Sequence, residues 1–253
     1  MTNPGTVIDH TRRSVSVPRR LMPSILAIHA GQSPHPATTV DELRAGGVVA
    51  DNRLDPLVTT LVEVMTNPTL VITVELSLEH QTRLATFWGT ARRAVVGLSD
   101  DRHRFELMQV EPNLLPFHLA QTTDMSPLPT LPFAGSFYLP ATTLHLVETS
   151  SGHDPSQALA ALLAAGVPHK WADRFMTALT LRRSLWTVES VWLGRDAPRT
   201  ESRLSVLDSG CAGYWRLAAD DDGAISVTTS SFEDVMRRFS ALLPTPRPPL
   251  TRM

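Results

Sequence analysis

The chain has 253 residues, of which 42% are hydrophobic and 19% charged, with a formal net charge of −2 and one cysteine. A chain of this length can bury a full core without disulfides or a structural metal, and one cysteine excludes both an internal disulfide framework and a cysteine-cluster zinc site. The near-neutral balance argues against a dedicated nucleic-acid-binding protein. No run of about 18 apolar residues occurs, so we expect no transmembrane helix and, without an export signal, a cytoplasmic protein.

The two ends of the chain differ in composition from the rest. Residues 1–20 contain four arginines, and we expect them to form a flexible basic arm that aids solubility rather than binding nucleic acid or membrane. Residues 244–253 are rich in proline, which lacks the backbone donor that helices and sheets require, so we expect a disordered tail. Residues 21–243 are then expected to form one domain.

The first half of this domain, residues 38–111, is predicted to contain two helices and three strands. A short helix at 38–45 ends before a glycine pair. A second helix begins after Asp55, whose carboxylate can accept from the first free backbone N–H groups, and ends at Asn67–Pro68. Alternating apolar residues then predict strands at 70–76, 94–98 and 103–110.

Residues 77–91 connect the first two of these strands, and we expect them to form a loop. The segment is long for a hairpin turn and carries Leu84, Phe87 and Trp88. Aromatic residues on a loop either pack back onto the core or anchor a partner. Both interpretations stay open at this point.

A Pro-rich crossover at 112–140 leads to the second half, residues 141–243. Helices are predicted to begin at Asp154–Pro155 and at Pro168. The second of these helices carries Trp171, Phe175 and Met176, which can belong to the core or line a groove. Strands are predicted at 185–193, 202–208, 213–219 and 224–229, and an amphipathic helix closes the domain.

The order of these elements indicates an α+β fold rather than a doubly wound α/β fold. Strands that are linked by short hairpins pair antiparallel. The same order, helix and then successive strands, occurs in both halves. We therefore expect a central antiparallel sheet that is built from two related halves.

The sequence contains no motif that carries chemistry. It has no His-x₃-His pair, no Gly-x-Ser-x-Gly elbow and no Gly-rich nucleotide fingerprint, so we expect no metal, no cofactor and no catalytic residue. Cys211 lies in a Gly-Cys-Ala-Gly string, but the residues after it alternate like a strand, whereas a nucleophile elbow requires a helix. The alternative is a small hydrolase or transferase whose polar residues converge around Cys211 only in three dimensions.

Several strings together resemble the EspG family. In the first half these are LRAGGVVADNRLDP, residues 43–56, and the strand pair at 92–98 and 103–110. In the second half they are VLDSGCAGYWRL, residues 206–217, and the strand and helix at 228–243. The resemblance implies a quasi-two-fold antiparallel sheet with helical bundles.

The resemblance also implies a function without chemistry. EspG proteins are cytosolic chaperones of type VII (ESX) secretion systems, which bind PE–PPE heterodimers at the apolar tip of the PPE subunit and keep them soluble. In that family the loop after the second strand and the C-terminal helical bundle form the binding surface, together with a sheet face. By position, the cargo-binding residues expected here are Leu84, Phe87 and Trp88 in the loop, with Trp88 and Phe87 as the anchor, and Trp171, Phe175 and Met176 on the helices.

Overall fold

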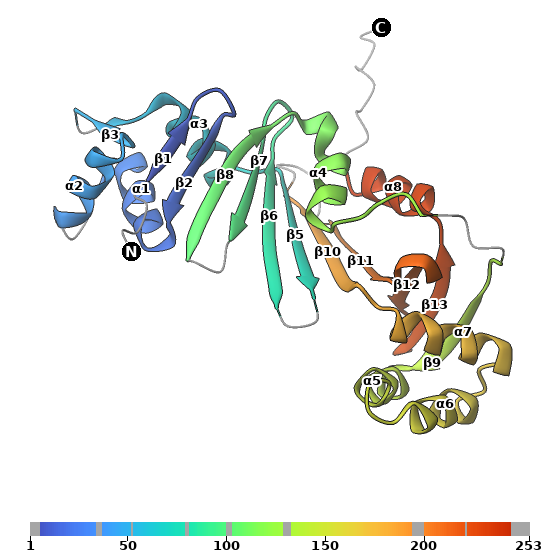
Figure 1. Ribbon diagram of the computed structural model, residues 1–253. Coiled ribbons are helices and arrows are strands. Elements are labelled where there is room, and N and C mark those ends of the chain that lie inside the picture. The colour runs from blue at the N-terminus through green and yellow to red at the C-terminus, as the bar shows by residue number, and fades with distance from the viewer. Residues whose placement is uncertain are drawn as a thin grey trace, which may run out of the picture. The chain divides into compact units, whose positions relative to one another are not determined.

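A computed structural model describes residues 6–33, 37–51, 53–78, 81–99, 103–128, 133–193, 200–220 and 222–243 (Figure 1). The proline-rich tail expected at 244–253 lies outside the described residues. The chain divides into two compact units. Unit 1 comprises Met1–Val74, Arg83–Leu115 and Ser190–Glu201, and unit 2 comprises Glu75–Thr82, Pro116–Glu189 and Ser202–Met253.

The helices and strands confirm an α+β fold that is built on a large antiparallel sheet. Unit 1 holds helices α1 (Met22–His29), α2 (Ala37–Ala45) and α3 (Pro56–Thr66). Its strands are β1 (Val7–Asp9), β2 (Ser14–Pro18), β3 (Val49–Ala50), β4 (Arg53–Leu54), β6 (Thr82–Gly89), β7 (Ala94–Ser99), β8 (Arg104–Val110) and most of β5 (Leu70–Ser77). Over the described residues the order in its sheet is β1-β2-β8-β7-β6-β5, and β3 pairs with β4 separately.

Unit 2 contains the remaining helices and strands. Its helices are α4 (Leu115–Thr122), α5 (Ala141–Ser150), α6 (Pro155–Ala164), α7 (His169–Thr180) and α8 (Phe232–Ala241). Its strands are β9 (Ser136–Pro140), β12 (Tyr214–Ala219), β13 (Ala224–Ser230) and most of β10 (Ser184–Trp192) and β11 (Thr200–Asp208). Their order is β10-β11-β12-β13-β9 over the described residues. In each unit a helix, α3 or α7, precedes four strands that follow one another in both chain and sheet.

Helix starts agree well with the local signals in the sequence. The Asp55 carboxylate accepts from the Leu57 N–H at 2.8 Å, and Asp154 accepts from the Gln157 N–H at 3.0 Å. Ser231 caps α8 in a capping box with Asp234. Each cap satisfies a backbone donor that has no partner inside the helix.

The prediction of a flexible arm at 1–20 is wrong for residues 6–20. The strand β2 lies between β1 and β8, with Val15 opposite Leu107, and the side chains of Val15 and Val17 are buried. The Ser-Val-Ser-Val alternation is a strand pattern, and the flanking arginines obscured it. Arg20 remains outside and binds Glu42 through two guanidinium–carboxylate hydrogen bonds.

The prediction of a loop at 77–91 is also wrong, because β6 occupies Thr82–Gly89. Its buried positions are Ala85, Phe87 and Gly89, which alternate with less buried ones. Because Phe87 and Trp88 are adjacent and both apolar, polar and apolar residues do not alternate in the sequence at these positions. The crossover at 112–140 likewise contains structure, namely α4 and the strand β9.

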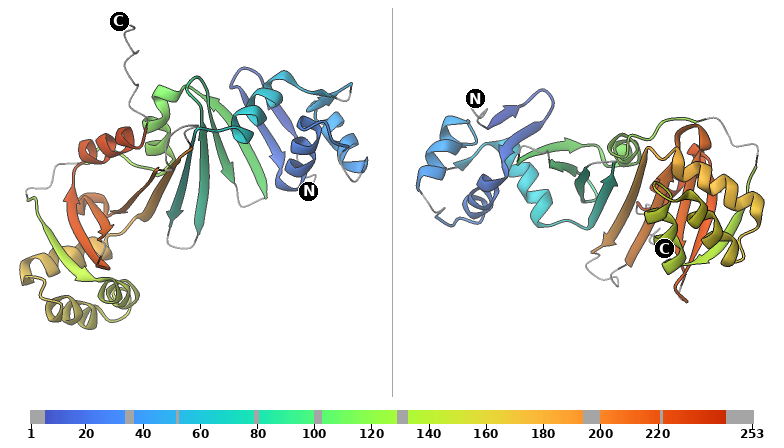
Figure 2. Two further views of the ribbon diagram at one scale, coloured as in Figure 1. Left: turned by 180° about the vertical axis from the view of Figure 1, so that it is seen from behind. Right: turned by 60° about the horizontal axis from the view of Figure 1, so that its bottom comes forward.

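Each unit buries its own core. In unit 1, α1 and α3 pack on the sheet face that carries Val15, Val95 and Leu107. In unit 2, α6 and α7 pack on the face that carries Leu207, Trp215 and Val227. The opposite face of unit 2 receives α8, where the rings of Trp186 and Phe239 lie 5.3 Å apart; Figure 2 shows α5–α7 and α8 on opposite sides of these strands.

Candidate functional site

Phe87 and Trp88 lie on β6 and contribute to the interior of unit 1. Phe87 is 1% exposed, so its side chain presents no surface to a partner in this structure. Trp88 is half-buried and meets Phe105 edge to face, with the ring centroids 6.2 Å apart. A Cβ atom at Gly97 would lie 2.7 Å from both rings. Any side chain at this position would therefore clash with the rings, and only glycine fits. A cargo-anchor role for these residues stays a prediction, while their contacts indicate a structural one.

Trp171 and Phe175 lie on α7 and belong to an aromatic cluster in unit 2. Phe175 is fully buried, with its ring 5.5 Å from that of Trp215. Trp171 is half-buried and meets Trp215 edge to face at 6.3 Å. Its ring also fills the space that a side chain on Gly135 would need. These two aromatic residues therefore join α7 to the sheet of unit 2.

Leu84 and Met176 are the two candidates without an aromatic ring, and they lie in different surroundings. Leu84 is 52% exposed on β6 in unit 1. Met176 is 9% exposed on α7 in unit 2, and its side chain lines an open pocket. Leu84 thus offers an exposed apolar side chain and Met176 the wall of a pocket. Phe87 and Phe175 are buried, and the half-buried Trp88 and Trp171 are engaged in ring contacts.

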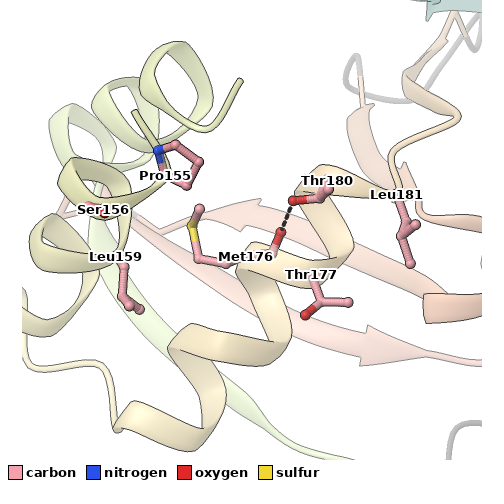
Figure 3. A pocket seen from close by; sticks show the side chains of 7 residues that line it. All are labelled: Pro155, Ser156, Leu159, Met176, Thr177, Thr180 and Leu181. Atoms are coloured by element: carbon pink, nitrogen blue, oxygen red, sulfur yellow. Dashed lines mark hydrogen bonds between the residues drawn. The ribbon is translucent and has the colours of Figure 1, made fainter. Parts of the chain in front are cut away.

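This pocket, which we call the α6–α7 groove, has a volume of about 410 Å³. It is lined by Pro155, Ser156, Leu159, Met176, Thr177, Thr180 and Leu181 (Figure 3). In Figure 3 the Met176 side chain points from α7 toward α6. Leu181, which caps the C-terminal end of α7, remains 43% exposed. Of these residues, only Met176 was predicted as a cargo contact.

The groove is more apolar than its composition indicates. The Thr180 hydroxyl donates to the Met176 carbonyl at 3.0 Å, and the Thr177 hydroxyl donates to the Asp173 carbonyl at 2.9 Å. A threonine hydroxyl that bonds back to its own helix is no longer free for a ligand. What both threonines can offer a ligand is therefore mainly their methyl groups, beside Leu159 and Met176.

Charged side chains also lie on the helical part of unit 2. Burial on α5 raises the pKa of the Glu148 carboxyl, and the nearby side chains of Arg182 and His145 lower it in part. Arg182 follows Leu181 directly in the chain. The end of the groove at Leu181 therefore adjoins a charged region.

The alternative site around Cys211 has no chemical support in the structure. Cys211 is exposed on a short 3₁₀ helix, Gly210–Ala212, and β12 follows it, so the helix of a nucleophile elbow is missing. Asp208 nearby is buried, which raises the pKa of its carboxyl, and it accepts from the Gly210 N–H at 2.8 Å. That bond and the Arg183 guanidinium at 3.9 Å give Asp208 a structural role in the turn.

The described part of the chain contains neither a metal-binding cluster nor a membrane-spanning helix. Among these residues no group of three or more His, Cys, Asp or Glu side chains could hold a metal ion. None of the helices found there is both long enough and apolar enough to cross a membrane.

Comparisons with known proteins agree with the fold. A search of curated proteins finds no match. Among solved structures, one match is the Mycobacterium tuberculosis type VII secretion system chaperone EspG5 in complex with a PE25–PPE41 dimer, with a TM-score of 0.64 at 14% identity. The match covers 91% of this chain and 97% of that one. The family model described as the EspG family matches residues 22–250, and the chain therefore belongs to the EspG family.

Proposed function

We propose that this protein is a cytosolic chaperone of a type VII (ESX) secretion system. It binds PE–PPE heterodimers at the apolar tip of the PPE subunit and keeps them soluble until secretion. The observation that carries this proposal is the α6–α7 groove, an open apolar pocket on the helical part of unit 2. Membership of the EspG family and the PE25–PPE41 complex of the similar EspG5 structure support the same role.

The proposed role follows from the physics of exposed apolar surface. A helical pair with an apolar tip in water associates unproductively unless a partner covers that tip. A pocket of about 410 Å³ accommodates one or a few apolar side chains, which would act as the buried anchors of a larger interface. No covalent bond is made or broken, so the role requires no catalytic residue.

The structure narrows the cargo-contact set that we propose. Met176 and Leu84 remain candidates for direct contact because both offer apolar surface. Leu159 and Leu181 join them as lining residues of the groove. The aromatic residues of β6 and α7 are proposed to act indirectly, by holding these elements in place.

Co-expression with the PE–PPE pairs that are encoded in the same genome, followed by co-purification, tests the proposal. We expect one pair to form a stable 1:1:1 complex with the full chain. Leu181→Glu should weaken the complex about thirtyfold or more, because it places a carboxylate in the apolar contact, with an expected cost of about 2 kcal/mol or more. Leu181 is already 43% exposed, so the fold should persist.

Leu26→Glu is the matched control, because Leu26 is 37% exposed on α1, outside the groove. We expect this variant to bind the pair as the wild type does. If the wild-type chain captures no pair, the proposed function is wrong. If Leu181→Glu binds as well as Leu26→Glu does, the groove is not the site.

A further inference from the structure

On one face of β10 and β11, burial decreases along the strands, from side chains in the core of unit 2 to exposed ones. Leu185 and Leu207, one on each strand, pack in the core with α7. Because side chains alternate along a strand, positions two and four residues away lie on the same face. These are Thr187 and Glu189 on β10, and Ser205 and Arg203 on β11. We call these four residues the open strand face.

Two contacts hold the open strand face in one register. The hydroxyls of Thr187 and Ser205 lie 3.0 Å apart and hydrogen-bond to each other. Two residues further along, Arg203 Nε lies 3.5 Å from Glu189 Oε1. The side chains of Arg203 and Glu189 are 69% and 53% exposed, although β11 has a neighbouring strand on both sides. No described segment of the chain covers the pair.

The open strand face is suited to being covered by a partner. Its two hydroxyls satisfy each other, so covering them leaves no unpaired donor. An exposed ion pair contributes only about 0–1 kcal/mol to stability. Breaking the Glu189–Arg203 pair so that each side chain can pair with a charge on a partner therefore costs little folding stability. Charges at the edge of an interface mainly select the partner, because like charges that face one another oppose binding.

We infer that Glu189 and Arg203 select the cargo of this chaperone. The partner that they fit is the tip of a PE–PPE pair that places an apolar side chain in the α6–α7 groove. Beside it, that tip carries a basic group opposite Glu189 and a carboxylate opposite Arg203. The open strand face continues from the core beneath α7, the helix that forms one wall of the groove, so one ligand surface can meet both. This inference rests on the proposed function.

A charge swap separates selection of cargo from a structural role. The double variant Glu189→Arg/Arg203→Glu keeps an ion pair across the two strands but reverses the charges that a partner meets. We expect its urea unfolding to match the wild type, and its affinity for the PE–PPE pair captured by the wild type to fall at least about tenfold. Binding by the wild type should also weaken with added salt, and the neutral variant Glu189→Gln/Arg203→Gln should lose most of this salt dependence.

The matched control is the swap Glu63→Arg/Arg93→Glu. That pair joins α3 to the turn before β7 at 3.6 Å and is similarly exposed, and its reversal should leave cargo binding unchanged. If the charge-swapped open strand face binds the wild-type cargo with unchanged affinity and salt dependence, the pair is only structural and the inference is wrong. If the wild type captures no PE–PPE pair, the proposed function fails and the inference falls with it. Should the swapped variant not fold, unchanged affinity and salt dependence of the neutral variant refute the inference equally.

Discussion

Replacing Trp88 by alanine distinguishes the structural role of this residue from the anchor role that the sequence suggests. The substitution removes an edge-to-face contact with Phe105 and uncovers Gly97. Truncation of a core tryptophan costs about 3–5 kcal/mol. Because Trp88 is only half-buried, we expect Trp88→Ala to lower the free energy of unfolding by less than this, about 2–3 kcal/mol.

Urea denaturation measures this cost, and a double-mutant cycle locates its origin. The cycle of Trp88→Ala and Phe105→Ala should give a coupling energy of about 0.5–1.5 kcal/mol, as for other aromatic pairs. At a temperature where Trp88→Ala remains folded, we expect it to bind cargo nearly as the wild type does. A variant that loses less than about 0.5 kcal/mol of stability but binds cargo tenfold more weakly would refute this reasoning and restore Trp88 as the anchor.

Three further substitutions test other parts of the structure. Gly135→Ala should lower the free energy of unfolding by about 1–3 kcal/mol, because its methyl group overlaps the Trp171 ring; urea denaturation followed by tryptophan fluorescence measures this. Leu84→Ala should change stability by less than about 0.5 kcal/mol, as expected at an exposed site, and weaken cargo binding in a titration. Burial raises the pKa of Asp208, so the native state holds its proton to higher pH and wild-type stability falls as pH rises through that window. Asp208→Asn keeps an acceptor for Gly210 and should lack this fall in urea denaturation between about pH 4 and 7; a pH profile identical to the wild type would contradict the assignment.

Most of the fold could be predicted because the signals for it are local. The cap at Asp55 and the cap at Asp154 each fix a helix start with residues that lie within one turn. The hairpin between β12 and β13 follows from an Asp-rich turn that ends in Gly223 with a positive φ of 78°. Such features depend on neighbours in the chain, so a single sequence contains them.

The two wrong predictions, an arm at 1–20 and a loop at 77–91, concern segments whose burial depends on residues far away in the chain. Val15 and Val17 are buried because β8 and the helices of unit 1 cover them, and nothing within residues 1–20 reveals those partners. β6 is hidden for a related reason, since both faces of this strand carry large side chains, Phe87 on one and Trp88 on the other. With a large apolar side chain on each face, the strand shows no alternation of polar and apolar residues at these positions.

The candidate site was harder to predict than the fold, because residue type is a poor guide to which side chains remain available. The sequence favours aromatic residues as contacts, yet Phe175 is buried. Trp171 packs edge to face on Trp215, and its ring fills the space beside Gly135. Large aromatic side chains tend to be buried in the core, because their burial contributes most to stability. The wall of the groove is instead formed in part by Thr177 and Thr180, which a sequence presents as polar. Their hydroxyls are satisfied by their own helix, so only the folded backbone turns two polar residues into an apolar surface.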